Sequence, residues 1–199
     1  MGLNVAWATL LSQFGGDSGG NVYVVLGPFA LVVSVAATVA AMRPGAAGGW
    51  FSAGVAQVAT GVGLGLVMVL LTYPAFDLAT AWFPWLEPQV ERLYQESRCA
   101  DLSVALLWTT VIMFAEEIVW RGVWLDVLGA RLGTAPAATL SVLAYAAAQL
   151  GSGSWVVCLL ALVCGSVWTL LRLHTRSLLP PLIAHAIWTP TVILLHPVV

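Results

Sequence analysis

The chain has 199 residues, of which 60% are hydrophobic and only 8% are charged, and its formal net charge is −2 at pH 7. Because a soluble domain carries about a quarter charged residues, this composition excludes an ordinary water-soluble fold. It also excludes nucleic acid as a partner, since the seven basic residues, all arginines, form no cluster that could neutralise phosphates. We therefore expect an all-α fold, a polytopic transmembrane helical bundle with about six spans that forms one domain over residues 1–199.

The first two predicted spans are continuous apolar runs, Val22 to Met42 and Trp50 to Tyr73. Each is long enough to cross the hydrocarbon of a bilayer, and Pro74 closes the second. Gly61 and Gly65 form a GxxxG pair in the second run, which predicts that another helix approaches closely on that face.

The next segment, from Pro74 to Asp101, mixes tryptophan and tyrosine with glutamate and arginine. Aromatic residues and charges together are typical of the membrane–water boundary. We therefore expect an amphipathic helix that lies at the membrane interface.

The second half of the chain contains four more apolar runs with short loops between them. Proline at position 136 suits the first position of a helix. Arginines gather in loops on one side of the bundle, which predicts that this side is cytoplasmic and that both termini lie outside. The lysine-free, arginine-only composition favours a bacterium, so we expect a multi-pass protein of the bacterial inner membrane. The runs are Leu102 to Leu128, Pro136 to Leu150, Trp155 to Leu171, and Leu178 to the C-terminus.

The third span carries three charged residues, Glu116, Glu117 and Arg121. A charge at the centre of a span costs about 2.5 to 3.5 kcal/mol, so these side chains must face protein or water. Glu117 and Arg121 are spaced i, i+4, which allows them to pair along one helix face. Glu116 is turned about 100° away and is free to face a cavity as a general base. A buried structural ion network is the alternative interpretation.

Three further polar residues are predicted to reach the same depth. Glu116 lies thirteen positions before Gly129 and Gln149 thirteen after Pro136, so both sit roughly 20 Å from the same turn. His185 and Thr189 are spaced i, i+4 in the last span and fall in the same half of the bundle.

These residues fall in three short motifs. Residues 114–122, FAEEIVWRG, resemble the EExxxR motif of the CAAX protease and bacteriocin-processing family of intramembrane glutamic endopeptidases, which is related to the CAAX prenyl endopeptidases. Residues 145–149, YAAAQ, are similar to the second motif of that family, FxxxH. Residues 185–189, HAIWT, resemble its closing HxxxN or HxxxD motif. The resemblance covers about residues 102–195, and the three motifs occur in the family's order and at its spacing.

The resemblance implies an intramembrane endopeptidase in which Glu116 activates water, the Glu117–Arg121 pair belongs to the first motif, and His185 stabilises the oxyanion. Gln149 stands where the family has histidine, and an amide cannot shuttle a proton at neutral pH. Thr189 stands for asparagine, and its hydroxyl can still donate one hydrogen bond. We expect no cofactor and no metal, because no HExxH is present and a neighbouring arginine disfavours a cation.

Two other functions remain open from the sequence. A family member that has lost turnover could act as a membrane binding or scaffold protein. A small transporter could use the buried carboxylates for proton coupling, although no internal repeat is visible. For the endopeptidase, the expected partners are membrane lipids and a membrane-associated protein or peptide substrate.

Overall fold

The computed structural model describes residues 32, 33, 35, 36, 50–96 and 101–199. Within these ranges every regular element is a helix, which confirms the predicted all-α class. The predicted first span, Val22 to Met42, lies outside the described residues apart from the four isolated positions.

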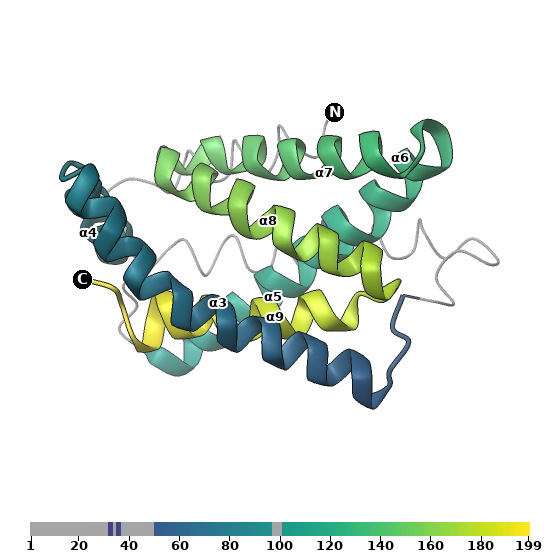
Figure 1. Ribbon diagram of the computed structural model, residues 1–199, viewed down its shortest axis with the longest axis horizontal. Helices are drawn as coiled ribbons and strands as arrows, with labels where there is room; N and C mark the ends of the chain where they lie inside the picture. Colours follow the sequence, from purple (N-terminus) through teal and green to yellow (C-terminus); the bar gives the residue numbers. More distant parts are fainter. Residues whose placement is uncertain (1–31, 34, 37–49, 97–100) are drawn as a thin grey trace.

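Ten helical elements follow one another between Val55 and Leu195, and most of them are α-helices. Figure 1 shows α3 beside α9 along one side of the bundle and α7 beside α8 along the other. The elements are α3 (Val55–Trp82), α4 (Leu86–Glu96), α5 (Leu102–Glu116), the π-helix η1 (Glu117–Trp124), α6 (Leu125–Leu132), α7 (Thr134–Ala148), the 3-10 helix η2 (Gln149–Ser152), α8 (Trp155–Thr175), α9 (Leu179–Thr189) and the π-helix η3 (Pro190–Leu195).

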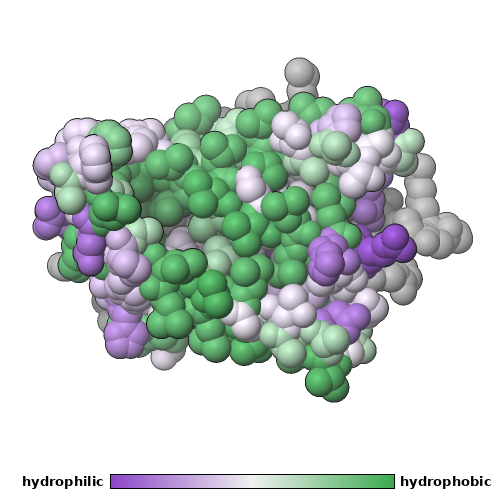
Figure 2. Space-filling view, viewed as in Figure 1, coloured by the Kyte–Doolittle hydropathy of each residue, from purple (hydrophilic) through white to green (hydrophobic). Residues whose placement is uncertain are grey.

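Three helices in the described part of the chain are long and apolar enough to cross a membrane. They are Val55–Trp82, the continuous α5-η1-α6 helix Leu102–Leu132, and Trp155–Thr175, with 28, 31 and 21 residues. Figure 2 shows a broad hydrophobic band between two more hydrophilic ends. Because such a band matches the hydrocarbon layer of a bilayer, the chain is a helical membrane protein. The predicted fourth and sixth spans form shorter helices, α7 and α9-η3.

The second predicted span has the wrong boundaries. The helix begins at Val55 rather than Trp50 and continues through Pro74 to Trp82. A proline inside a membrane helix is tolerated when neighbouring groups satisfy the backbone it disturbs. Pro74 leaves the carbonyl four residues earlier, that of Leu70, without its helical N–H partner, and the helix continues past this point. The predicted interfacial segment is therefore divided between the end of α3 and α4.

Helix α4 is amphipathic, as predicted for this segment. Val90 is buried, whereas Glu87 and Glu91 are exposed. The hydroxyl of Tyr94 donates to the Val192 carbonyl at 3.0 Å and so ties α4 to η3.

The small residues of α3 allow close contact with α9. A Cβ atom built on Gly61 would lie 2.8 Å from the Pro180 carbonyl oxygen, and one on Gly65 would lie 3.1 Å from the Ala184 Cα. Both distances are shorter than ordinary van der Waals contact. The predicted GxxxG face therefore exists, and its partner is the last helix of the same chain.

The third span is not a regular α-helix, which differs from the sequence-based expectation. From Glu117 onward its hydrogen bonds follow the π pattern, in which each N–H bonds to the fifth preceding carbonyl. The Ser141 hydroxyl of α7 donates to the Trp120 carbonyl at 2.6 Å. Contact with a neighbouring helix thus supports a backbone geometry that the local sequence does not reveal.

Trp50 ties the segment that precedes α3 to the end of the bundle that carries the α8–α9 turn. Its indole N–H donates to Asp126 Oδ2 at 2.7 Å, and its carbonyl accepts from the Leu178 N–H at 2.6 Å. The ring also covers Gly122, where a Cβ atom would lie 3.0 Å from it.

Candidate active site

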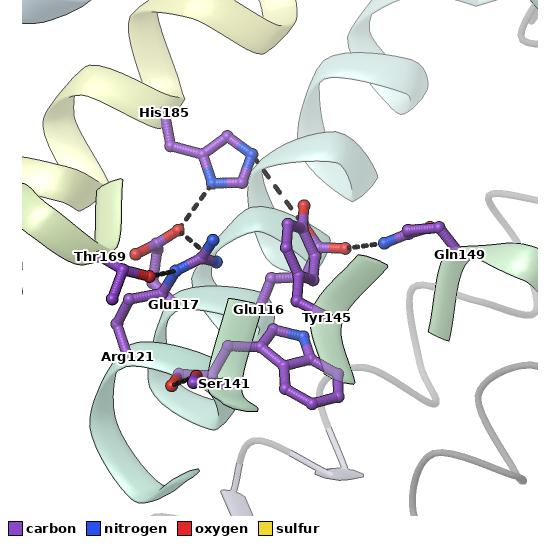
Figure 3. Close-up of polar contacts among 9 residues, drawn as sticks. Glu116, Glu117, Arg121, Ser141, Tyr145, Gln149, Thr169 and His185 are labelled. Carbon is purple, nitrogen blue, oxygen red and sulfur yellow. Dashed lines mark hydrogen bonds and ion pairs between the residues drawn. The ribbon is translucent and has the colours of Figure 1, made fainter. Parts of the chain in front are cut away.

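Glu116 is the last residue of α5, and two donors from neighbouring elements hold its carboxylate. The Tyr145 hydroxyl of α7 donates to Oε2 at 3.1 Å, and the Gln149 amide of η2 donates to Oε1 at 3.0 Å. Glu116 is only 7% exposed. Figure 3 shows the tyrosine and the glutamine converging on this carboxylate. These two hydrogen bonds therefore fix the orientation of the carboxylate.

Glu117, the next residue, belongs to a separate charge network. Its Oε1 accepts from Arg121 Nη1 at 3.1 Å, the i, i+4 pair that the sequence predicts. His185 Nδ1 of α9 lies 3.0 Å from the same oxygen. Arg121 Nε also donates to the Thr169 hydroxyl of α8, at 3.4 Å. Three elements, η1, α8 and α9, thus meet around a fully buried arginine.

Aromatic rings enclose the Arg121 guanidinium. Its central carbon lies 4.4 Å from the centre of the Tyr145 ring and 5.4 Å from that of Trp168. Such stacking stabilises a cation that has lost its water. Gly165 makes room for the stack, because a Cβ atom there would lie 2.9 Å from Arg121 Nη2 and 2.9 Å from Tyr145 Cδ1.

His185 stands between the two carboxylates. Its Nδ1 faces Glu117, while its Nε2 lies 3.9 Å from Glu116 Oε2. The imidazole stacks on the Trp168 indole with ring centres 3.6 Å apart and an interplanar angle of 21°. The structure therefore brings Glu116, Gln149 and His185 together from three helical segments, as the depth argument predicted.

Thr189 is less closely connected. It lies one turn after His185 in the wall of the same cavity. Its hydroxyl is buried, and among the described residues it has no hydrogen-bond partner. The structure therefore places Thr189 near the other predicted site residues without joining it to any of them.

A cavity of about 240 Å³ opens beside Glu116. Glu116, Tyr145, Gln149 and His185 line it together with two threonines, and the rest of the wall is apolar. A volume of this size can hold several waters or a short stretch of extended peptide. The apolar wall is made by Leu93, Ile112, Met113, Val157, Leu160, Ala161, Cys164, Trp168, Trp188 and Ile193.

The comparisons with known proteins support the same interpretation of the motifs. Residues 99–190 match the family model of the type II CAAX prenyl endopeptidase Rce1-like proteins. This segment belongs to the CAAX protease family. The match contains all six predicted site residues, and it supports a CAAX-type intramembrane protease. Neither the curated proteins nor the solved structures gave a match to the chain.

The sequence-based prediction missed three residues of this candidate site. Tyr145 and Thr169 contact the charged residues directly, and Trp168 packs on His185. Tyr145 could have been found, because it lies four residues before Gln149 and so shares its helix face. The positions of Trp168 and Thr169 depend on how α8 packs, for which the sequence carries no comparable signal. Within the described ranges, no group of three His, Cys, Asp or Glu residues is arranged to hold a metal ion.

Proposed function

We propose that this protein is an intramembrane endopeptidase in which the Glu116 carboxylate activates water to hydrolyse a peptide bond. The proposal rests on one observation. Of two adjacent buried carboxylates, Glu116 lines the cavity, whereas Glu117 is paired with Arg121 and His185. The paired residues hold the helices together, and the other carboxylate faces the space where a substrate and a water can meet.

The neighbouring groups suit this reaction. The Gln149 amide fixes one oxygen of Glu116, so the carboxylate keeps its direction while it accepts a proton from water. When the His185 imidazole carries both protons, Nδ1 donates to Glu117 and Nε2 is free to donate to an oxyanion. Thr189 has an unused hydroxyl in the same wall and can supply a second donor. The roles of Glu117 and Arg121 are to position His185 and Tyr145.

The proposed substrate is a membrane-associated protein or peptide tail that reaches the cavity from the bilayer. The name of the matching family indicates a prenylated Cys-a-a-X tail as the first substrate to test. The long apolar helices support a multi-pass protein surrounded by membrane lipids, and we propose the bacterial plasma membrane as its location. The apolar wall of the cavity fits a substrate with hydrophobic side chains.

Replacing Glu116 by glutamine tests the proposal. The full-length protein is purified in detergent micelles and given a quenched-fluorescent peptide that ends in a prenylated Cys-a-a-X sequence. In parallel, mass spectrometry compares the protein termini in membranes of cells that express wild type or Glu116→Gln. Cleavage by wild type, and its loss in the variant with normal protein yield, is the expected result. The exposed Glu91→Gln is the matched control and should cleave normally.

A binding or scaffold protein of the same family is the second candidate. Two observations favour it: an amide stands where the family has a histidine, and the Thr189 hydroxyl has no partner within the described residues. This candidate predicts that wild type and Glu116→Gln give identical protein termini and that neither cleaves the peptide. That result would rule out the endopeptidase.

A further inference from the structure

Tyr145 is a second proton-bearing group at the candidate catalytic centre. Its hydroxyl donates to Glu116 Oε2 at 3.1 Å, and the residue lines the cavity although only 5% of it is exposed. A phenol is protonated at neutral pH, because its ordinary pKa is about 10. The residue can therefore give up a proton during a reaction and take it back afterwards.

Peptide hydrolysis needs such a group, because an amine leaves poorly until its nitrogen is protonated. Gln149 cannot provide the proton, since an amide does not ionise at neutral pH. Arg121 cannot either, because a guanidinium does not lose its proton in a protein. Besides Glu116 itself, Tyr145 and His185 are the described polar residues of the cavity that can carry a proton and that touch or approach the Glu116 carboxylate.

The geometry favours the tyrosine over the histidine. His185 Nε2 lies 3.9 Å from Glu116 Oε2, which is beyond hydrogen-bond distance, whereas the tyrosine oxygen is within it. The imidazole is also held by Glu117 and by stacking on Trp168. The guanidinium 4.4 Å from the centre of the Tyr145 ring favours the negative charge that the phenol acquires when it gives up its proton.

We propose that Tyr145 is a catalytic residue, which passes the proton that Glu116 takes from water to the nitrogen of the leaving amine. The assignment rests on the proposed function, and it explains how the site can work without the histidine of the second motif. In this chain the motif reads Tyr145 and Gln149, so the proton carrier has moved from its last residue to its first.

The water oxygen forms a bond to the peptide carbonyl carbon, the carbonyl electron pair moves to its oxygen, and one water proton goes to Glu116. When the oxyanion collapses and the carbon–nitrogen bond breaks, the Tyr145 hydroxyl proton goes to the nitrogen. The protonated Glu116 then returns its proton to the phenolate oxygen through the same hydrogen bond. The products are an acid and an amine, and both residues recover their starting forms.

The first test is Tyr145→Phe, which keeps the ring over Arg121 and removes only the hydroxyl. Loss of general acid help typically costs 10² to 10⁴ in rate, so we expect cleavage of the prenylated Cys-a-a-X peptide to fall by about 10²-fold or more. Tyr73→Phe is the matched control, because Tyr73 donates to a backbone carbonyl at the far end of α9-η3. Melting temperatures of both variants show whether the fold is intact.

The second test restores the arrangement of the family motif. Tyr145→Phe combined with Gln149→His gives a phenylalanine followed four residues later by a histidine, and we expect it to recover at least tenfold over Tyr145→Phe alone. A third measurement replaces the scissile amide of the peptide by an ester, whose leaving group needs no proton. Tyr145→Phe should then lose less than about tenfold. A residue that only orients Glu116 would affect ester and amide alike.

Each outcome bears on one of the two proposals. If Glu116→Gln abolishes cleavage but Tyr145→Phe stays within tenfold of wild type, the relay is wrong and the endopeptidase stands. Equal losses on ester and amide, or no recovery in the double variant, also overturn the relay. If wild type is inactive and the double variant cleaves, Tyr145 does not deliver the proton. If neither protein cleaves peptide or cellular substrates, both proposals fail.

Discussion

The contact between α3 and α9 offers a test of how the active site is held in place. A methyl group on Gly61 would lie 2.8 Å from the Pro180 carbonyl oxygen, whereas ordinary contact begins at 3.4 Å. The two helices would therefore have to separate by about 0.6 Å. Overpacking of this kind costs about 1 to 3 kcal/mol. We expect Gly61→Ala to lower the stability of the protein by that amount.

Gly65→Ala should also affect catalysis. Its methyl group would lie 3.1 Å from the Cα of Ala184, which precedes His185 in the chain. A shift of α9 by a few tenths of an ångström moves the imidazole relative to Glu116. Since a misplacement of 1 Å can cost 10²-fold in rate, we expect a loss of about tenfold.

Gly63→Ala is the matched control for both substitutions, because the methyl group would meet no other described atom within 4 Å. It should leave stability unchanged or raise it by up to about 1 kcal/mol. Tryptophan fluorescence during heating in detergent micelles measures the three melting temperatures, and about 2 to 4 °C is expected per kcal/mol. If Gly63→Ala destabilises the protein as much as Gly61→Ala, the substitution itself rather than the α3–α9 contact is responsible.

Two further predictions concern residues around the site. Gly165→Ala should lower the melting temperature by a few degrees and reduce peptide cleavage, because its methyl group would lie only 2.9 Å from Arg121 Nη2 and would displace the guanidinium. Unchanged cleavage and stability would show that the guanidinium and the rings stacked on it can move without loss of stability. Trp50→Phe should destabilise the protein by about 0.5 to 1.5 kcal/mol, because the hydrogen bond from the indole to Asp126 is lost. The exposed Trp82→Phe, measured in the same heating experiment, should have no comparable effect.

Much of the bundle could be predicted because its determinants are local in the sequence. Apolar runs indicate membrane helices whatever their neighbours are, and the spacing of Glu117 and Arg121 fixes their pairing on one helix face. The shared depth of Glu116 and Gln149 follows from equal distances to one turn. The resemblance to the CAAX protease family supplied the expected roles, which the geometry by itself does not assign.

The features that the sequence did not reveal depend on contacts between helices. Pro74 normally ends a helix, yet α3 continues through it, and just before it the Thr72 hydroxyl accepts a hydrogen bond from the Trp188 indole of α9. The spacing of Tyr145 and Gln149 places both on one helix face, but the bond from the tyrosine hydroxyl to Glu116 depends on how α7 packs against α5. In the π-helical segment from Glu117 onward, the Trp120 carbonyl likewise accepts a hydrogen bond from Ser141 of another helix.

The π-helical segment Glu117–Trp124 has a consequence for any comparison of this span with another helix. A π-turn takes in one more residue than an α-turn before its hydrogen bond closes. An alignment that assumes an uninterrupted α-helical repeat would therefore rotate every later position by about 100° about the helix axis. Asp126 would then be assigned to the wrong side of the helix, away from Trp50. After this segment, the face of the helix on which a residue lies cannot be deduced from its number by the α-helical repeat alone.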